Sequence, residues 1–258
     1  MRKSYIPEDH IRAKSLKLRE KLADNVSTRV VVEEGLIAHG RGEAFDYLIG
    51  EKTIPPAVDA IRAAAASLLL ARHPVISVNG NLAALSSISV AKLSEITKSK
   101  VEVNLFHRSS EREYAIMRIL KEAGVIDVLG LEAFSTIPEI GSDRRKVDSK
   151  GILISDLVLL SLEDGDRTDA LVNMGKKVIV IDLNPISRSA KRASITIVDN
   201  VVRAMPKLVN TVNKLRELDE NQLLKIVGSF NNHINLDLTL KYMIRRLTRL
   251  AKGEMVVQ

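Results

Sequence analysis

The fold of this chain of 258 residues is decided at residues 74–85, which have the sequence Pro-Val-Ile-Ser-Val-Asn-Gly-Asn-Leu-Ala-Ala-Leu. The β-branched run from Val75 to Val78 follows a proline and stops at Asn79, where an Asn-Gly-Asn triplet lets the backbone turn. An alanine-rich helical pattern begins at Leu82. These features predict a strand, a tight turn and a helix, and the N–H groups of such a turn and helix end can bind an anion. A turn that only connects two elements is the alternative, and from this segment alone it is the better supported one.

The same arrangement recurs along the chain: an apolar run ends, and polar or charged residues follow at once. Helical patterns separate the runs, and this alternation is typical of βαβ units. The carboxyl ends of parallel strands lie along one edge, where ligands bind. We therefore expect an α/β fold, a three-layer Rossmann-like and mostly parallel sheet with N- and C-terminal helical extensions. The polar strand ends expected on the common edge are 79–81, 106–109, 163–168, 182–185 and 199–200.

We expect a single α/β domain over residues 1–258, with a helical segment at 1–72, the sheet core at 73–205 and further helices at 206–258. The segment 132–151 interrupts the alternation and carries the charged cluster 143–146. Such a connection is a functional loop or lid in some proteins and a solvated surface loop in others, and the residues favour neither. Helices are expected at 10–26, 43–49, 57–71, 83–98, 111–123, 200–215 and 221–252, and strands at 75–78, 101–105, 126–129, 157–162, 178–181 and 195–198.

The composition excludes several kinds of chemistry. There is no cysteine, which rules out disulfides, a thiolate nucleophile, Cys-ligated zinc and iron–sulfur clusters. The N-terminus lacks the apolar core of a signal peptide and no apolar run could span a bilayer, so we expect a cytoplasmic protein without a membrane partner. The net charge of +7 suits either a polyanion or a pocket for phosphates and carboxylates. An aromatic content of 3% argues against nucleic acid, because single-strand binders use aromatic stacking.

A glycine-rich motif surrounds Arg41. Gly40 and Gly42 flank this arginine and would let the backbone approach a ligand closely, and a helix is expected from Glu43 until Gly50. The motif lacks the third glycine of a dinucleotide fingerprint, and no Walker A motif is present.

Charged residues elsewhere suggest a phosphorylated ligand and a metal ion. Arg41, Arg108, Arg167 and Arg188 could neutralise a triphosphate and a second acidic ligand, and Arg19 lies beside an apolar helix stripe from which it could reach a phosphate. The acidic trio Glu163, Asp164 and Asp166 could support hydrated Mg²⁺, although a helix N-terminus rich in acidic residues explains the trio better. A carboxylate directly after an apolar strand, as at Asp182, commonly accepts a ribose hydroxyl.

Five motifs together resemble the archaeal-type phosphopantothenate synthetases, and the resemblance runs from about residue 6 to residue 206. These motifs are Gly-Leu-Ile-Ala-His-Gly-Arg-Gly-Glu-Ala-Phe-Asp-Tyr-Leu (35–48), Pro-Val-Ile-Ser-Val-Asn-Gly-Asn (74–81), Leu-Glu-Asp-Gly-Asp-Arg-Thr (162–168), Ile-Asp-Leu-Asn-Pro-Ile-Ser-Arg (181–188) and Ile-Thr-Ile-Val-Asp-Asn (195–200). The chain departs from the family pattern at Ile11 and Ala13, where proline and tyrosine are frequent, at His107, often tyrosine, and at Ser189, often threonine.

The resemblance implies a homodimeric, ATP-dependent ligase of coenzyme A biosynthesis that joins phosphopantoate to β-alanine and releases AMP and pyrophosphate. It implies no nucleic-acid partner, and Mg²⁺ is expected with the ATP. Arg41 and His39 are the catalytic candidates, with His39 contacting phosphopantoate. The implied ATP contacts are Arg19, Arg41, Asp182, Leu183, Asn184, Arg188, Ser189, Asp199 and Asn200. The candidate substrate contacts are Asn79, Asn81, Arg108, Asp166 and Arg167, and no metal ligand is assigned.

Two other functions remain open at this stage. An NAD(P)-dependent oxidoreductase on a similar sheet would need the complete glycine fingerprint after its first strand, which Asn79-Gly80-Asn81 does not supply. A basic nucleic-acid-binding protein would use the stripe of Lys241, Arg245 and Arg249 on the last helix, and its retention of DNA or RNA would depend strongly on salt.

Overall fold

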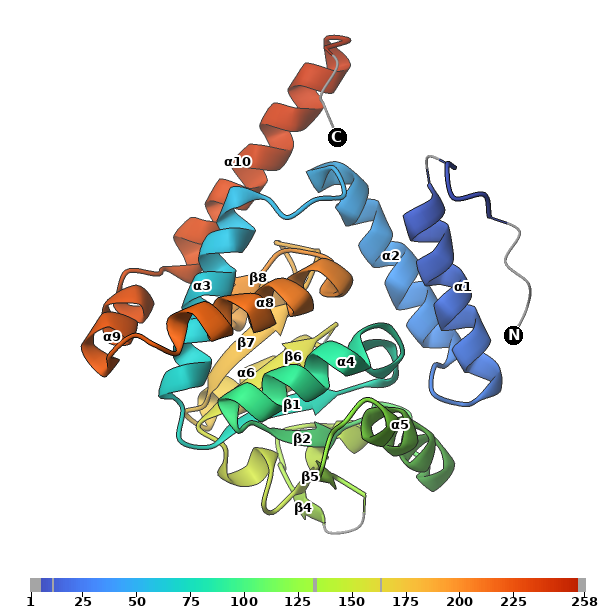
Figure 1. Cartoon of the computed structure of the whole chain (residues 1–258), viewed down its shortest axis with the longest axis vertical. Coiled ribbons are helices and arrows are strands. Elements are labelled where there is room, and N and C mark those ends of the chain that lie inside the picture. The colour runs from blue at the N-terminus through green and yellow to red at the C-terminus, as the bar shows by residue number, and fades with distance from the viewer. Residues whose placement is uncertain (1–5, 11, 132–133, 163, 255–258) are drawn as a thin grey trace.

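A six-stranded sheet forms the middle of the molecule (Figure 1). The computed structural model describes residues 6–10, 12–131, 134–162 and 164–254. Every neighbouring pair of strands in this sheet is parallel, and the strand order reverses between β1 and β6. The parallel α/β fold is therefore confirmed, with its polar strand ends on one edge. In spatial order the strands are β3 (Val128–Leu129), β2 (Lys100–Val103), β1 (Pro74–Val78), β6 (Leu157–Ser161), β7 (Lys177–Ile181) and β8 (Ile195–Ile197).

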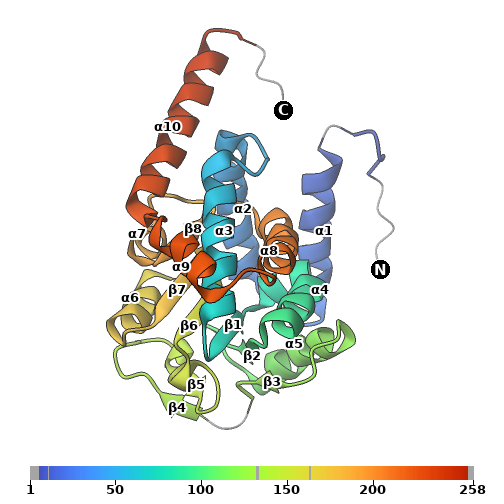
Figure 2. The same cartoon turned by 60° about the vertical axis from the view of Figure 1, so that its left-hand side comes forward.

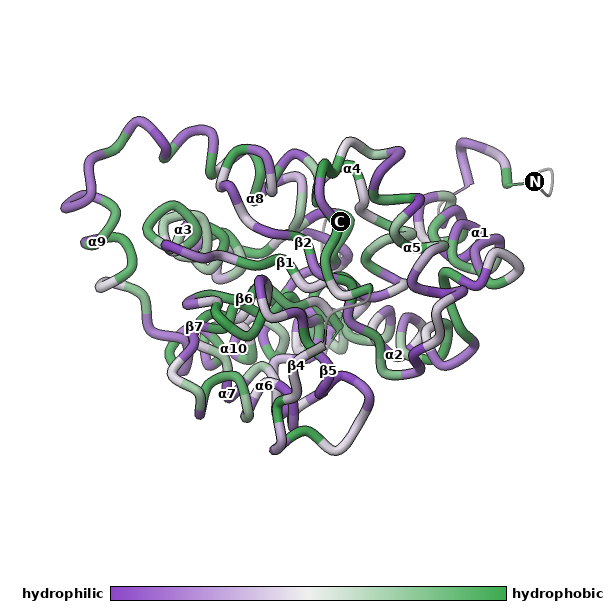
Figure 3. Tube along the Cα trace, turned by 90° about the horizontal axis from the view of Figure 1, so that it is seen from below, coloured by the Kyte–Doolittle hydropathy of each residue, from purple (hydrophilic) through white to green (hydrophobic). Residues whose placement is uncertain are grey.

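Helices cover both faces of this sheet because its strands are apolar on both sides. Successive side chains point to opposite faces, so Ile76 and Leu159 pack in one core cluster while Val158 and Val180 pack in another. The first face is covered by α3 (Pro55–Leu70), α4 (Gly80–Thr97), α5 (Ser110–Glu122) and α8 (Val201–Leu215). The second face is covered by α6 (Gly165–Asn173) and a β-hairpin. Figure 3 shows α3 as a largely hydrophobic helix, consistent with its burial against β8, α8 and α9.

The second helix of the N-terminal part begins earlier than expected. Helix α1 (Ala13–Ser27) is followed by α2 (Glu33–Ile49), which begins well before Glu43, so Gly40 and Gly42 lie inside a helix. The expected start of this helix at Glu43 was wrong, because glycine weakens a helix by only about 1 kcal/mol and packing can offset that. The predicted end is confirmed: Gly50 closes α2 with a left-handed φ of 87°.

The charged segment 132–151 contains regular structure. Strands β4 (Phe134–Thr136) and β5 (Lys146–Asp148) pair antiparallel, with the 3-10 turn η1 (Asp143–Arg145) between them and η2 (Ile152–Ile154) after them. Ile137, Ile140 and Val147 are buried in the core cluster of the second sheet face. This hairpin is therefore packed on the sheet, and the alternative of a solvated surface loop was wrong.

The C-terminal helical pattern at 221–252 is interrupted. Helix α9 (Glu220–Gly228) ends, and α10 (Asn232–Ala251) starts again after Asn231, whose side chain accepts a hydrogen bond from the Ile234 backbone. Figures 1 and 2 show α10 extending away from the sheet and its covering helices. No helix in the described ranges is both long and apolar enough to cross a membrane.

Candidate active site

A cavity of about 420 Å³ lies beyond the carboxyl ends of β1, β2, β6 and β7, with α2 as its cover. Its position at the reversal of strand order is where open parallel sheets bind ligands. Its volume is within the range of small-molecule sites. Of the candidate residues, those on its wall are Arg41, Asn79, Asn81, Asp182 and Asn184.

The turn after β1 joins three parts of the molecule. Asn79 donates to the Ser161 carbonyl at 2.7 Å and accepts from the Leu82 N–H at 3.0 Å, so it caps α4 and ties β1 to β6. Asn81 donates to the Gly35 carbonyl of α2 at 2.8 Å. A Cβ atom on Gly80 would lie 2.0 Å from the Val30 carbonyl oxygen, so only glycine fits at this position.

The loop between β7 and α7 (Arg188–Arg192) supplies a carboxylate. The carboxylate of Asp182 accepts hydrogen bonds from the Asn184 N–H at 2.9 Å and from the Ser187 hydroxyl at 2.6 Å. Burial raises the pKa of Asp182 above its usual value, and the nearby charge of Arg41 opposes this shift. Arg41 itself is exposed and makes no hydrogen bond or ion pair with any residue in the described ranges. Its guanidinium is thus available to an anionic ligand.

A cluster of buried charges attaches α2 to the sheet behind this cavity. Arg203 of α8 contacts Asp46 of α2 at 2.6 Å and Asp199 at 2.7 Å. Asn200 donates to Asp46 at 2.9 Å, and Thr53 donates to Asp199 at 2.6 Å. Burial raises the pKa of Asp199, although Arg203 opposes the shift.

A small cavity of about 20 Å³ lies beside this cluster and shares Gly42 and Leu162 with the main one. Its wall includes His39, Leu183, Asp199 and Asn200. Burial lowers the pKa of His39. Leu162 has a left-handed backbone with φ of 51°, an unfavourable conformation for a residue with a side chain and one often found at functional sites.

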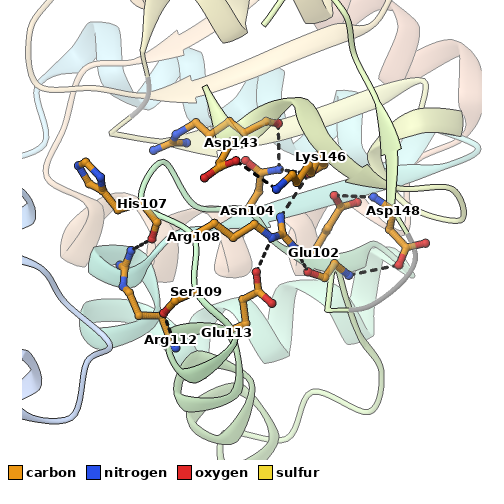
Figure 4. Close-up of polar contacts among 12 residues, drawn as sticks. Glu102, Asn104, His107, Arg108, Ser109, Arg112, Glu113, Asp143, Lys146 and Asp148 are labelled. Carbon is orange, nitrogen blue, oxygen red and sulfur yellow. Dashed lines mark hydrogen bonds and ion pairs between the residues drawn. The ribbon is translucent and has the colours of Figure 1, made fainter. Parts of the chain in front are cut away.

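The hairpin is attached to the opposite side of the cavity by the polar contacts in Figure 4. Glu102 of β2 accepts from the backbone N–H of Asp148 at 3.0 Å and of Ile152 at 2.7 Å. Asn104 donates to the carbonyls of Arg144 at 3.2 Å and Lys146 at 3.0 Å. Burial raises the pKa of Glu102 to about 7.

Six candidate residues lie off both cavities. Arg19 pairs with Glu43 on another face of α2 at 2.8 Å, beside a separate hollow between α1 and α2. Arg108 pairs with Glu113 and donates to the Gly130 and Lys146 carbonyls (Figure 4).

The other four lie near α6 and α7. Arg188 is exposed and pairs with Asp166 at 2.8 Å and Asp169 at 3.1 Å. Arg167 is fully buried, where it donates to the Ser77 hydroxyl at 3.0 Å, and Ser189 is buried at the start of α7.

The structure adds wall residues that were not among the candidate ATP and substrate contacts. Ser187 and Asp164 belong to motifs already singled out, and Arg144 belongs to the charged cluster 143–146. Gly35 is the first residue of the motif 35–48, whereas Arg112 carries no local signal that would have identified it.

The acidic trio is only partly suited to a metal ion. Asp164 lines the cavity, Asp166 is exposed and pairs with Arg188, and Glu163 lies outside the described residues. The described residues contain no group of three or more His, Asp or Glu that could hold a metal. Any Mg²⁺ here would therefore take most of its ligands from phosphate oxygens and water.

A parallel sheet in this strand order, with a polar cavity at the point of reversal, defines a Rossmann-like α/β protein with a site for an anionic ligand. Residues 56–246 match the phosphopantothenate/pantothenate synthetase family. The chain is 50% identical over 248 residues to the 4-phosphopantoate--beta-alanine ligase of Thermococcus kodakarensis, an alignment that covers 96% of this chain and 95% of that protein. It is 46% identical over 246 residues to the protein of the same name from Methanosarcina mazei, covering 95% and 97% of the two chains. The chain belongs to the phosphopantothenate/pantothenate synthetase family.

Proposed function

We propose that this protein is an ATP-dependent ligase that condenses 4-phosphopantoate with β-alanine to 4′-phosphopantothenate, with release of AMP and pyrophosphate. The family membership supports the reaction. The observation that carries the proposal is the available guanidinium of Arg41 over a cavity that also presents Asp182 and the N-terminus of α4.

The reaction needs an activated carboxylate. An oxygen of the phosphopantoate carboxylate attacks the α-phosphorus of ATP, pyrophosphate leaves, and an acyl adenylate forms. The free amine of β-alanine then attacks the carbonyl carbon, the bond to the AMP oxygen breaks, and the proton on nitrogen passes to solvent. The protein would hold the reactants close together and neutralise phosphate charge.

We place ATP across the two adjoining cavities. Asp182 would accept a ribose hydroxyl and Arg41 would donate to the phosphates, with Asn184 beside them. The wall of the small cavity would complete this side of the ATP site with Leu183, Asp199 and Asn200. The buried imidazole of His39 lies on the same wall. Arg19, Arg188 and Ser189 stay candidates through the family resemblance alone. Mg²⁺ would bind with the ATP, and Asp164 is the described carboxylate best placed to contact it.

We further propose a cytoplasmic homodimer that binds no nucleic acid. Helix α10 extends from the body and exposes Ile244, Leu247 and Leu250, which suits contact with a second copy. The basic stripe on the same helix leaves nucleic-acid binding as the competing role for this surface. A filter-binding titration with DNA and RNA at two salt concentrations distinguishes nucleic-acid binding from contact with a second copy. Retention that falls steeply with salt would indicate nucleic acid, because such binding releases counterions.

The role of Arg41 is tested by Arg41→Ala. Because the substitution removes a charge-assisted hydrogen bond, kcat/KM for ATP should fall by roughly a hundredfold. Arg118→Ala is the matched control, since Arg118 is an exposed arginine whose 3.9 Å contact with Glu122 lies on the outside of α5. An Arg41→Ala enzyme with unchanged turnover at limiting ATP would remove Arg41 from the site.

The products test the reaction itself. Phosphopantoate, β-alanine and ATP should give one AMP and one pyrophosphate for each amide formed, with pantoate as the comparison acid. ADP and phosphate would indicate an acyl phosphate, and the absence of any ATP-dependent amide would reject the ligase. Reduction of NAD(P) by a hydroxy acid would favour the oxidoreductase instead.

A further inference from the structure

The main cavity has two charged ends. Asp182 follows β7 at one end, whereas His107 and Arg112 follow β2 at the other, where Glu34 of α2 also lines the wall. Three strand spacings separate β7 from β2 in the sheet, so the two ends are roughly 14 Å apart. A nucleotide with its ribose at Asp182 therefore leaves the end near β2 to another reactant.

Three carboxylates lie on the described wall of this cavity, and they differ in what they already bind. Asp182 accepts two hydrogen bonds from its own loop, and Asp164 caps α6. Glu34 is in the first turn of α2, with a side chain that is 64% exposed. Among the described residues its one cationic contact is Nε2 of His107 at 3.9 Å, which is too long for a hydrogen bond. Glu34 can thus accept hydrogen bonds from a cationic ligand.

Arg112 of α5 supplies a positive charge at the same end. It is 9% exposed and donates to the backbone carbonyls of Arg29 at 3.2 Å, Val30 at 3.3 Å and His107 (Figure 4). These bonds use one N–H of each guanidinium nitrogen, so each of the two terminal nitrogens keeps a second donor for a ligand. Burial lowers the pKa of Arg112, and the nearby negative charge of Glu34 opposes this shift.

Glu34 and Arg112 border the same turn after β1. Asn81 of that turn donates to the carbonyl of Gly35, next to Glu34, at 2.8 Å, and a Cβ atom on Gly80 would lie 3.3 Å from a terminal nitrogen of Arg112. Within the part of the chain that the structure describes, the two opposite charges do not form an ion pair with each other. Each is therefore open to the opposite end of a small zwitterion.

We propose that Glu34 binds the ammonium of β-alanine and that Arg112 binds its carboxylate, so that this end of the cavity is the site of the amine substrate. This assignment rests on the proposed ligase function. β-Alanine is a zwitterion whose nitrogen and carboxylate carbon lie about 4 Å apart when it is extended. A planar guanidinium matches a carboxylate, and a glutamate oxygen matches an ammonium hydrogen.

This end of the cavity is also open to solvent, since the side chains of Glu34 and His107 are 64% and 52% exposed. The bound ammonium gives one proton to solvent, and the nitrogen then attacks the carbonyl carbon of the acyl adenylate. The bond from that carbon to the AMP oxygen breaks, AMP leaves with the electron pair, and the second proton on nitrogen follows the first to solvent.

The test compares Glu34→Gln with Glu33→Gln. Both residues are exposed in the first turn of α2, so each substitution removes one negative charge from the same helix end, and of the two only Glu34 lies on the cavity wall. For Glu34→Gln we expect KM for β-alanine to rise roughly tenfold, with KM for ATP and for phosphopantoate within about twofold of the wild type. Glu33→Gln should match the wild type, and Glu34→Asp should recover part of the loss.

The carboxylate contact is tested by Arg112→Lys and by 3-aminopropan-1-ol, an amine that has no carboxylate. Lysine keeps the charge of Arg112 but lacks its planar fork. We expect kcat/KM for β-alanine to fall roughly tenfold in Arg112→Lys, and kcat/KM for 3-aminopropan-1-ol to stay within about twofold. An equal loss with both amines would remove Arg112 from the site, because it would show that this side chain only holds the start of α2.

Three results with Glu34 would overturn the assignment: an unchanged KM for β-alanine in Glu34→Gln, an equal rise in KM for phosphopantoate, or an equal loss in Glu33→Gln. If Arg112→Lys does not fold, Glu34→Gln decides alone, since it changes the charge of an exposed side chain and keeps its size. A wild-type protein that forms no AMP from phosphopantoate, β-alanine and ATP rejects the ligase function itself, which is a different outcome from an active enzyme that is indifferent to Glu34.

Discussion

Helix α2 and the hairpin both border the cavity, and they are attached to the sheet in different ways. The C-terminal half of α2 is attached by side chains paired with side chains, because Asp46 contacts Arg203 and Asn200. The hairpin is held by side chains of the sheet that bond its backbone, as Glu102 and Asn104 do. Attachment through the backbone places no direct restriction on which side chains the hairpin carries. Attachment through side chains restricts which residues α2 can carry.

The largest effect should come from breaking the α2 attachment with Arg203→Ala. The side chain of Asp199 is fully buried and that of Asp46 is 6% exposed, so both carboxylates would lose their cation in a poorly solvated place. We expect the free energy of unfolding to fall by about 3–5 kcal/mol, measured by urea denaturation. Arg216→Ala, which removes an exposed pair with Glu217, should cost less than about 1 kcal/mol. Equal losses in the free energy of unfolding for Arg203→Ala and Arg216→Ala would contradict the role of Arg203 in attaching α2.

The hairpin attachment should instead respond to pH. Glu102 is fully buried with a pKa of about 7, while an unfolded chain releases this proton near its ordinary value of 4.5. Since the folded state holds the proton over that interval, the stability from this group is present below about pH 4 and declines as the pH rises to about 7. The decline should total about 3 kcal/mol.

Glu102→Gln tests this pH dependence. The variant cannot titrate, so its free energy of unfolding should lack the part of the slope between pH 4.5 and 7 that Glu102 contributes. Glu139→Gln, at an exposed position on the same hairpin, should keep the wild-type slope. Identical slopes in Glu102→Gln and the wild type would show that Glu102 does not titrate in this interval.

The smallest effect is expected for Asn104→Ala. The substitution removes two hydrogen bonds to the hairpin backbone and leaves the carbonyls of Arg144 and Lys146 without that donor, so we expect a loss of about 1–3 kcal/mol. Hydrogen exchange should become faster at 134–148 and stay unchanged in α2. Faster exchange in both elements would mean that the two attachments are coupled.

Much of the site's framework could be predicted from the sequence. Each apolar run with a polar end became a strand of the parallel sheet, and Asp182 and Asn79 lie where the strand-end argument expected them, on the cavity wall. The start of helix α2 could not be predicted, because glycine is a poor helix former and only the packing of α2 against α1, α4 and α10 shows that the helix runs through Gly40 and Gly42. The break before α10 was missed for the opposite reason, since the helical pattern continues through Gly228.

The sequence by itself determined the class of fold, the edge of the sheet that carries the polar residues, and the exclusion of cysteine chemistry. These depend on local patterns: the alternation of apolar runs, the turn residues that follow them and the composition. Only the tertiary structure decided which arginines line the cavity. Arg41 is available, Arg108 is bound in the hairpin attachment, and Arg144 reaches the wall because Asn104, 40 positions earlier, holds its carbonyl. Contacts between residues so distant in the chain leave no periodic signal, so the direction of a charged side chain becomes known only when its neighbours in space are known.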